Sequence, residues 1–171
     1  MDVKGIHILI KYRMYKSLLN FTLVLILFLI DRFSKIYVIE LAEKTNASEI
    51  YLTSFLNSYL VWNTGIAFGL FSLSNELTYN LFTTLIILIN LIIIYLVTIT
   101  KDFRKYFFLL ILGGSLGNLF DRLYYGSVPD FIDLHIGNFH WFIFNIADIF
   151  ITMGVICLIL AELMYKKETN G

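Results

Sequence analysis

The sequence is short of the residues that build disulfides, metal centres and nucleic-acid-binding surfaces. Its one cysteine, Cys157, can form no disulfide within the chain and no multi-cysteine metal site. Its three histidines are scattered and lack the His-Glu-x-x-His spacing of a metalloprotease, so we expect no metal and no other cofactor. Charged residues make up only 15% of the chain and sum to a net charge of zero, which gives no indication of nucleic-acid binding.

Apolar residues dominate the chain instead. Of its 171 residues, 58% are hydrophobic and 17% are aromatic, which is far more than in an average soluble domain. A helix that crosses a membrane needs about 20 mostly apolar residues. Such residues fill the stretches 17–38, 77–99, 106–124 and 141–163. We therefore predict an all-α membrane protein with four transmembrane helices, in which residues 1–171 form a single domain.

The basic residues predict the orientation of these helices. Nine of the thirteen lysines and arginines precede the first stretch, link the second to the third, or follow the fourth. The positive-inside rule places them, and therefore both chain termini, in the cytoplasm. The connections 40–76 and 125–140 then lie outside. The longer one mixes aromatic and β-branched residues with polar ones, which predicts a small extracytoplasmic β-rich cap at about 40–76, between the first two helices.

Polar side chains gather at the predicted outer ends of the helices. Those on the helices are Asp31, Lys35, Asn118, Asp121, Arg122, Asn145 and Asp148, and Asn63 and Asp130 in the outer connections can reach the same layer. An aspartate within a membrane helix costs about 2.5–3.5 kcal/mol on insertion scales, so Asp148 is a candidate functional residue.

Several of these residues also have a purely structural interpretation. Asp31 and Lys35 have the i,i+4 spacing of an interfacial ion pair, which can also support a site. Arg122 can anchor a lipid headgroup with Asp121 as its partner, and Asn145 can join two helices through hydrogen bonds.

Two other groups are expected to have structural or peripheral roles. Asp133 is interpreted as a solvated acid in a loop. The small residues Gly113, Gly114, Ser115 and Gly117 form one helix face, which favours close helix packing over phosphate binding.

A pair of aspartates can catalyse hydrolysis. Two carboxyl groups held close together cannot easily both ionise, so they share a proton and act as base and acid. If Asp130 and Asp148 form such a pair, one takes a proton from an attacking water while the other protonates the carbonyl oxygen. Arg122 or the asparagines can then hold an extended substrate backbone.

A small proton-coupled transporter is the alternative from another class, because such proteins also use intramembrane aspartates. A transporter needs polar residues through the full depth of the membrane. The predicted cytoplasmic halves of the helices are almost purely apolar. The sequence therefore favours an enzyme over a transporter.

Five motifs occur in one order along the chain. They are Asp31-Arg-Phe-Ser-Lys35, Asn63-Thr-Gly-Ile-Ala-Phe68, Gly113-Gly-Ser-Leu-Gly-Asn-Leu-Phe-Asp-Arg122, Val128-Pro-Asp-Phe-Ile132 and Phe144-Asn-Ile-Ala-Asp148. Together they closely resemble the bacterial lipoprotein signal peptidase family, also called signal peptidase II, over about residues 31–148.

The resemblance implies an aspartic endopeptidase of the bacterial inner membrane with its active site at the outer face. Enzymes of this family remove the signal peptide from prolipoproteins by cutting just before a cysteine that already carries diacylglyceryl. The implied partners are a diacylglyceryl-prolipoprotein substrate and membrane lipids. The chain is expected to act as a monomer.

The matching motifs also imply residue roles. The resemblance makes Asp130 and Asp148 the catalytic pair. The supporting residues are Asn63, Asn118, Arg122 and Asn145 in the pocket, Asp31 and Lys35 as structural supports, and Asp121, which is expected to orient Arg122. Asp121 is also the alternative to Asp130 as a catalytic residue, and we prefer Asp130 because Asp121 stands beside Arg122. Pro129 departs from the motif, which would carry an aliphatic residue there.

Overall fold

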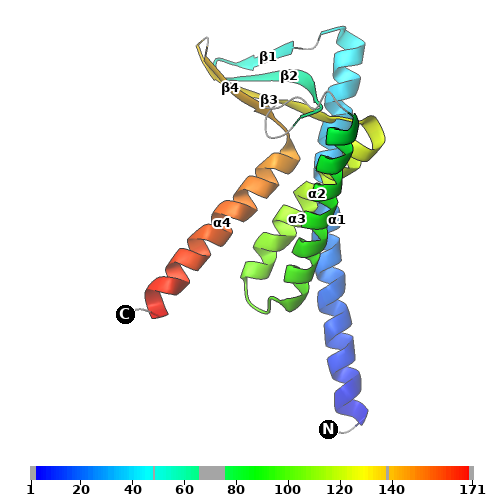
Figure 1. The fold of residues 1–171 in the computed structure, drawn as a ribbon, viewed down its shortest axis with the longest axis vertical. Helices are drawn as coiled ribbons and strands as arrows, with labels where there is room; N and C mark the ends of the chain where they lie inside the picture. Colours follow the sequence, from blue (N-terminus) through cyan, green and yellow to red (C-terminus); the bar gives the residue numbers. More distant parts are fainter. Residues whose placement is uncertain (1–2, 48, 66–75, 138, 170–171) are drawn as a thin grey trace.

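Four helices and a four-stranded sheet make up the described part of the chain, which in this computed structural model comprises residues 3–47, 49–65, 76–137 and 139–169. The helices are α1 (Val3–Thr45), α2 (Glu76–Ile99), α3 (Arg104–Tyr125) and α4 (Ile146–Thr169). The strands are β1 (Glu49–Thr53), β2 (Leu56–Asn63), β3 (Val128–Ile136) and β4 (Phe139–Phe144). Figure 1 shows the sheet at one end of the helices and the N-terminal part of α1 projecting beyond the other end.

Two of the described helices are long and apolar enough to cross a membrane. They are Glu76–Ile99 and Ile146–Tyr165, with mean hydropathies of 2.6 and 2.3. Many of their large apolar side chains face outward, among them Leu81, Ile92 and Met153. An aqueous solvent would make such outward faces unfavourable, whereas lipid would not. Charged residues interrupt α1 and α3, in the region where these two helices contact each other.

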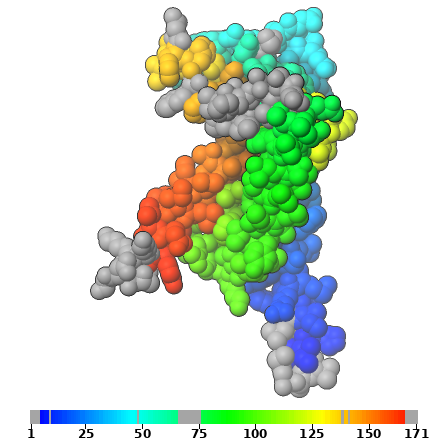
Figure 2. All heavy atoms as spheres, viewed as in Figure 1, coloured from blue at the N-terminus to red at the C-terminus, as the bar shows by residue number. Residues whose placement is uncertain are grey.

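Helix α3 is the centre of the helical bundle. It contacts α1, α2 and α4, and Figures 1 and 2 both show it between α2 and α4. Its small residues face the neighbouring helices. A Cβ on Gly113 would lie 2.7 Å from the Cβ of Leu27, and a Cβ on Gly117 would collide with the carboxylate of Asp31. The predicted role of the glycine face in close helix packing is therefore confirmed.

The sheet is antiparallel in the order β1-β2-β3-β4. The prediction placed a β-rich cap in the connection 40–76 alone, and this is wrong in one respect. β1 and β2 come from that connection, but β3 and β4 come from the connection between α3 and α4. In this second connection the sequence predicted only a loop around Asp133. Residues 66–75 of the predicted cap lie outside the described residues.

Two helices, α4 and α1, have bounds that clearly differ from those expected. Helix α4 begins at Ile146 rather than at 141, because the preceding Phe-His-Trp-Phe-Ile-Phe run forms β4. The aromatic strand leads almost directly into the apolar helix. Hydropathy therefore shows one continuous apolar segment and does not reveal where the helix begins. Helix α1 extends far beyond 17–38 at both ends, since its polar flanks contain no helix-breaking residue such as proline.

Candidate active site

Asp130 lies on β3, inside the sheet. It is paired in register with Val61 of β2 and is only 3% exposed. Two asparagine amides hold its carboxylate. Asn63 Nδ2 on β2 donates to Oδ2 at 2.8 Å, and Asn145 Nδ2 donates to Oδ1 at 2.6 Å. The Asn63 bond crosses between neighbouring strands, which explains why a residue 67 positions earlier in the chain reaches this carboxylate.

Asp148 lies in the first turn of α4 and forms a capping box with Asn145. The Asn145 side-chain Oδ1 accepts a hydrogen bond from the Asp148 N–H at 3.2 Å, and Asp148 Oδ2 accepts one from the Asn145 N–H at 3.1 Å. Such reciprocal bonds satisfy N–H groups that a helix start otherwise leaves unpaired. Asn118 Nδ2 on α3 donates to the other oxygen, Oδ1, at 2.8 Å.

Asn145 therefore joins the two predicted catalytic acids. Its side-chain amide binds Asp130, and its backbone N–H binds Asp148. Because Asn145 is the residue between β4 and α4 and is fully buried, the end of the sheet and the start of the helix meet at this point. The site thus depends on a junction of strand and helix.

The electrostatics of Asp130 suit acid–base chemistry. Burial and, after it, the nearby charge of Asp148 raise the pKa of Asp130 from 3.8 to about 6. The hydrogen bonds from Asn63 and Asn145 oppose this shift, because they stabilise the ionised form. A carboxyl group that titrates near 6 can exchange a proton close to neutral pH.

A second group of charges lies beside Asp130 and Asp148, and in it two cations pair with two carboxylates. Lys35 Nζ is fully buried and donates to Asp31 Oδ2 at 2.8 Å, to Asn118 Oδ1 at 2.8 Å and to Asp121 Oδ2 at 2.6 Å. All three donors of the ammonium group are therefore used. Arg32 completes the group by pairing with the other oxygen of Asp121.

This charged group is connected to the carboxylate pair at two points. Asn118 accepts from Lys35 through its oxygen and donates to Asp148 through its nitrogen, so its amide orientation is fixed. Asp31 Oδ1 accepts a hydrogen bond from the Ala147 N–H in the first turn of α4 at 3.0 Å. An acid at a helix N-terminus is favourable because that end carries partial positive charge. The charged group therefore fixes the helix start that carries Asp148.

Arg122 has a different environment from the one predicted. Its Nη2 donates to the Gly65 carbonyl at 2.9 Å, and its guanidinium lies over the Phe82 ring. The Asp121 carboxylate pairs with Arg32 and Lys35, so the expectation that it orients Arg122 is wrong. Neighbouring residues on a helix point in directions about 100° apart, which separates these two side chains. Arg122 Nε and Nη1 are buried and have no hydrogen-bond partner among the described residues.

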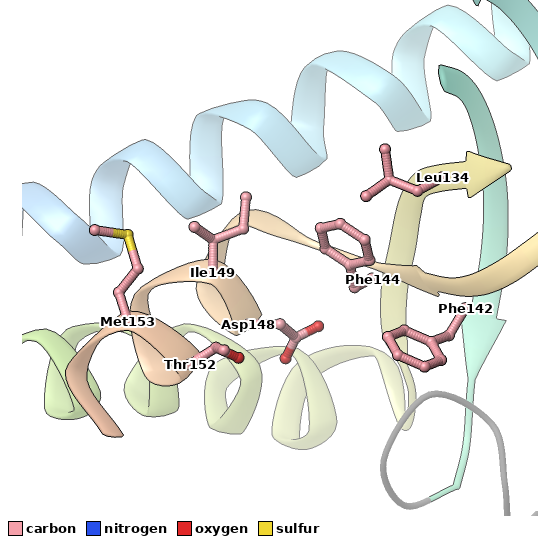
Figure 3. Close-up of a pocket in the computed structure, with 7 residues that line it drawn as sticks. All are labelled: Leu134, Phe142, Phe144, Asp148, Ile149, Thr152 and Met153. Carbon is pink, nitrogen blue, oxygen red and sulfur yellow. The ribbon is translucent and has the colours of Figure 1, made fainter. Parts of the chain in front are cut away.

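An apolar cavity opens next to Asp148 (Figure 3). Its volume is about 350 Å³, and its walls are Leu134, Phe142, Phe144, Asp148, Ile149, Thr152 and Met153. In Figure 3 the Asp148 carboxylate lies between Thr152 and the two phenylalanine rings. A largely apolar cavity with one acid in its wall fits a ligand that has an apolar body and a polar group.

Sequence reasoning therefore named most of the residues that the structure gathers here. Besides the wrong pairing of Asp121 with Arg122, it made one omission and one further error. It missed Arg32, although Arg32 lies three positions before Lys35 and therefore on the same helix face. It was wrong about Asp133, which is 2% exposed and lies within β3 rather than in a solvated loop. The strand had been missed, and the burial of its inward residues was missed with it.

Comparisons with known proteins agree with these features. A family model described as Signal peptidase (SPase) II matches residues 23–164. A protein of Pelagibacter ubique named lipoprotein signal peptidase is 52% identical over 153 residues, which cover 89% of this chain and 92% of the relative. A protein of the same name from Francisella tularensis subsp. novicida is 46% identical over 129 residues, covering 72% and 79%.

Two solved structures described as bacterial membrane enzymes have a similar fold. One has a TM-score of 0.65 and 29% sequence identity, covering 89% of this chain and 91% of that structure. The other has a TM-score of 0.66 and 32% identity, covering 84% and 92%. The similarity in sequence and the similarity in fold extend over the same large part of the molecule. This chain belongs to the signal peptidase II family.

Proposed function

We propose that this chain is an aspartic endopeptidase in which Asp130 and Asp148 are the catalytic pair. One observation carries the proposal: a single residue, Asn145, donates hydrogen bonds to both carboxylates. The side chains that donate to them are the amides of Asn63, Asn118 and Asn145 rather than cations. Amide donors orient a carboxylate without supplying the full positive charge that would keep it ionised.

The proposed reaction is hydrolysis of a peptide bond by water. The ionised member of the pair takes a proton from a water, whose oxygen attacks the carbonyl carbon. The protonated member gives its proton to the developing oxyanion. The carbon–nitrogen bond then breaks as the amine takes the proton that the first aspartate gained from water, while a hydroxyl proton of the intermediate returns to the second aspartate. Arg122 supports this step, since its unpaired Nε and Nη1 can donate to carbonyl groups of an extended substrate.

The proposed substrate is a prolipoprotein whose cysteine carries diacylglyceryl, cut just before that cysteine. The relatives that resemble the chain carry the name lipoprotein signal peptidase. The apolar cavity beside Asp148 offers room for an apolar signal-peptide side chain or for acyl carbons next to the scissile bond. Such a substrate brings its bond to the level where the helices end and the sheet begins.

We also propose that all four helices cross the bacterial inner membrane, with both termini in the cytoplasm and the sheet on the outer side. The distribution of basic residues supports this orientation. Helices α1 and α3 can cross despite their charges, because those charges are buried against each other. All the residues of the proposed site come from one chain, which supports activity as a monomer. The transporter alternative has no support from the family comparisons.

The test is cleavage of a diacylglyceryl-modified prolipoprotein by the purified protein in detergent. Asp130→Asn and Asp148→Asn are each expected to lower kcat by at least about 1000-fold, because either change removes the acid–base pair. Asp102→Asn is the matched control, since Asp102 is an exposed aspartate in the link between α2 and α3. It should cleave at the rate of the unmodified protein. Normal turnover by either of the first two variants would refute the catalytic assignment.

A further inference from the structure

A second cluster of possible ligand groups lies on the hairpin formed by β3 and β4. It consists of Asp133, His135 and His140, whose ligand atoms all lie within 4.8 Å of one another. Asp133 Oδ2 lies 2.8 Å from His140 Nδ1 and 3.7 Å from His135 Nδ1. The two imidazole rings are stacked with their centroids 5.1 Å apart. None of these residues takes part in the proposed peptidase reaction.

The hairpin is built so that these three residues meet. Asp133 and His135 are two positions apart on β3 and therefore share one face of the sheet. The register between the strands shifts at this point. The pair Asp133↔Ile143 would place Trp141 opposite His135 if continued, but the shift places His140 there instead. Bulges of this kind redirect a side chain and often occur at functional sites.

The two buried members of the cluster, Asp133 and His135, each have a polar atom that forms no hydrogen bond to the described residues. Asp133 Oδ1 and His135 Nδ1 are both buried and have no hydrogen-bond partner in the part of the chain that the structure describes. Both side chains are more than nine-tenths buried, at 3% and 8% exposure, while His140 is 53% exposed and opens the cluster to solvent. A buried polar atom without a partner costs about 1–3 kcal/mol, so a ligand that bonds to both atoms would be favoured here.

We propose that Asp133, His135 and His140 bind a divalent transition-metal ion, with Zn²⁺ as the best fit. Two imidazole nitrogens and one carboxylate oxygen are ordinary zinc ligands, and a water at the exposed side completes four-coordination. Ligands at about 2.0–2.2 Å from zinc in a tetrahedron are about 3.4 Å apart. That spacing lies between the 2.8 Å and 3.7 Å that separate Asp133 Oδ2 from the Nδ1 atoms of His140 and His135. The proposal differs from the expectation from sequence that the chain holds no metal.

A bound ion would tie β3 to β4 behind the active-site cavity. Leu134, between the two β3 ligands, points to the opposite face and lines the cavity with Phe142 and Phe144 (Figure 3). Asp130 lies three residues before Asp133 on the same strand. The ion would therefore hold the wall of the substrate cavity in one register, and its role would be to position that wall rather than to react.

Metal binding to the purified, full-length protein tests the proposal, with a purification tag that contains no histidine. Co²⁺ is the probe because it gives a visible absorption band when it is four-coordinate, and Zn²⁺ should displace it. We expect one equivalent of Co²⁺ per chain at about 0.1 mM metal or below. His140→Gln should weaken binding more than about 10-fold. Loss of a residue that only hydrogen-bonds to a metal ligand already costs at least about 10-fold in affinity, and His140 is proposed to be a ligand itself. Because His140 is exposed, this variant should leave the fold unchanged.

The matched control is His7→Gln. His7 is the one histidine of the chain outside the cluster, and it lies exposed on α1. Zn²⁺ should raise the Tm of the unmodified protein and of His7→Gln, but not that of His140→Gln. Absence of Co²⁺ binding, or equal binding by His140→Gln and the unmodified protein, would overturn the proposal and leave an Asp–His hydrogen-bonded cluster. Neither readout requires peptidase activity, so this outcome would leave the proposed function unaffected.

Discussion

Two pairs of aspartates lie close together in this molecule but have opposite surroundings. Asp31 and Asp121 contact Lys35 and Arg32, so each carboxylate has a cation as a direct partner. Asp130 and Asp148 receive side-chain hydrogen bonds from Asn63, Asn118 and Asn145. The comparison shows how one residue type can serve two purposes. Cationic partners make an acid part of the scaffold, whereas amide partners orient an acid and leave it able to exchange a proton.

Asn118 lies between the two pairs and forms a hydrogen bond on each side. It accepts from Lys35 with its oxygen and donates to Asp148 with its nitrogen, each at 2.8 Å. Asn118, a neutral group, therefore links the position of Lys35 to that of the Asp148 carboxylate. A lysine in direct contact with Asp148 would favour the ionised form of that acid, and the proposed pair could then not share a proton.

The largest expected effect on stability comes from removing Lys35, the cation that Asp31 and Asp121 share. Lys35→Met leaves Asp31 and Asp121 buried with their common partner lost, and breaking a buried ion pair in this way costs about 3–5 kcal/mol. Asp130→Asn and Asp148→Asn should change stability by far less, because an amide replaces an acid that has no directly bonded cation. Thermal unfolding in detergent measures all three. Equal losses of stability would mean that the two pairs do not differ as described.

The next effect concerns Asn145, which joins the two proposed catalytic acids. Asn145→Ala removes the side-chain bond to Asp130 and the N-cap of α4, but it keeps the backbone N–H that binds Asp148. Loss of such a cap costs about 1 kcal/mol of stability. The loss in kcat should be about 100-fold, at the lower end of the effect of losing an acid–base contribution. Asn145→Asp offers a contrast, since it keeps the cap and adds a charge next to the pair.

The titration of Asp130 gives a third prediction, in which two variants shift its pKa in opposite directions. Asp148→Asn should lower the pKa of Asp130 from about 6, because it removes a negative charge that disfavours ionisation. Asn63→Ala should raise the pKa, because it removes a hydrogen bond to the ionised form. The carboxyl band in the infrared spectrum reports the protonated fraction. Shifts in the same direction would contradict the roles given to Asp148 and Asn63.

The same shift links stability to pH. Because the pKa of Asp130 is raised on folding, its protonated form favours the folded state. Its contribution is complete below pH 3.8 and is lost as the pH rises through about 6. The unmodified protein should therefore lose stability relative to Asp130→Asn between these values. A difference that stays constant across this range would show that the pKa is not raised.

Whether a site residue or a strand could be predicted from the sequence depends on the kind of pattern that identifies it. Asp31, Lys35, Asn118 and Asp148 were found because helical spacing and the cost of polar groups in a membrane are readable from the chain. The strands β3 and β4 were missed because a short aromatic strand before an apolar helix has no boundary in hydropathy. The partners of Asp121 and Arg122 depend on which helix faces are in contact, and one sequence does not contain that information.

The smallest expected effect comes from an exposed ion pair that shares its helix, spacing and order of acid and base with Asp31–Lys35. Glu40 and Lys44 lie on the same helix, with the same i,i+4 spacing and the same order of acid and base, at 3.1 Å. Their side chains are 57% and 73% exposed, whereas those of Asp31 and Lys35 are fully buried. Lys44→Met should therefore cost less than about 0.5 kcal/mol, as for exposed helix pairs in general. Because helix, spacing and sequence order are shared, a difference from Lys35→Met in the same unfolding measurement must come from burial and from the contacts of Lys35 to α3. A cost for Lys44→Met near that of Lys35→Met would instead attribute the stability to the helix itself.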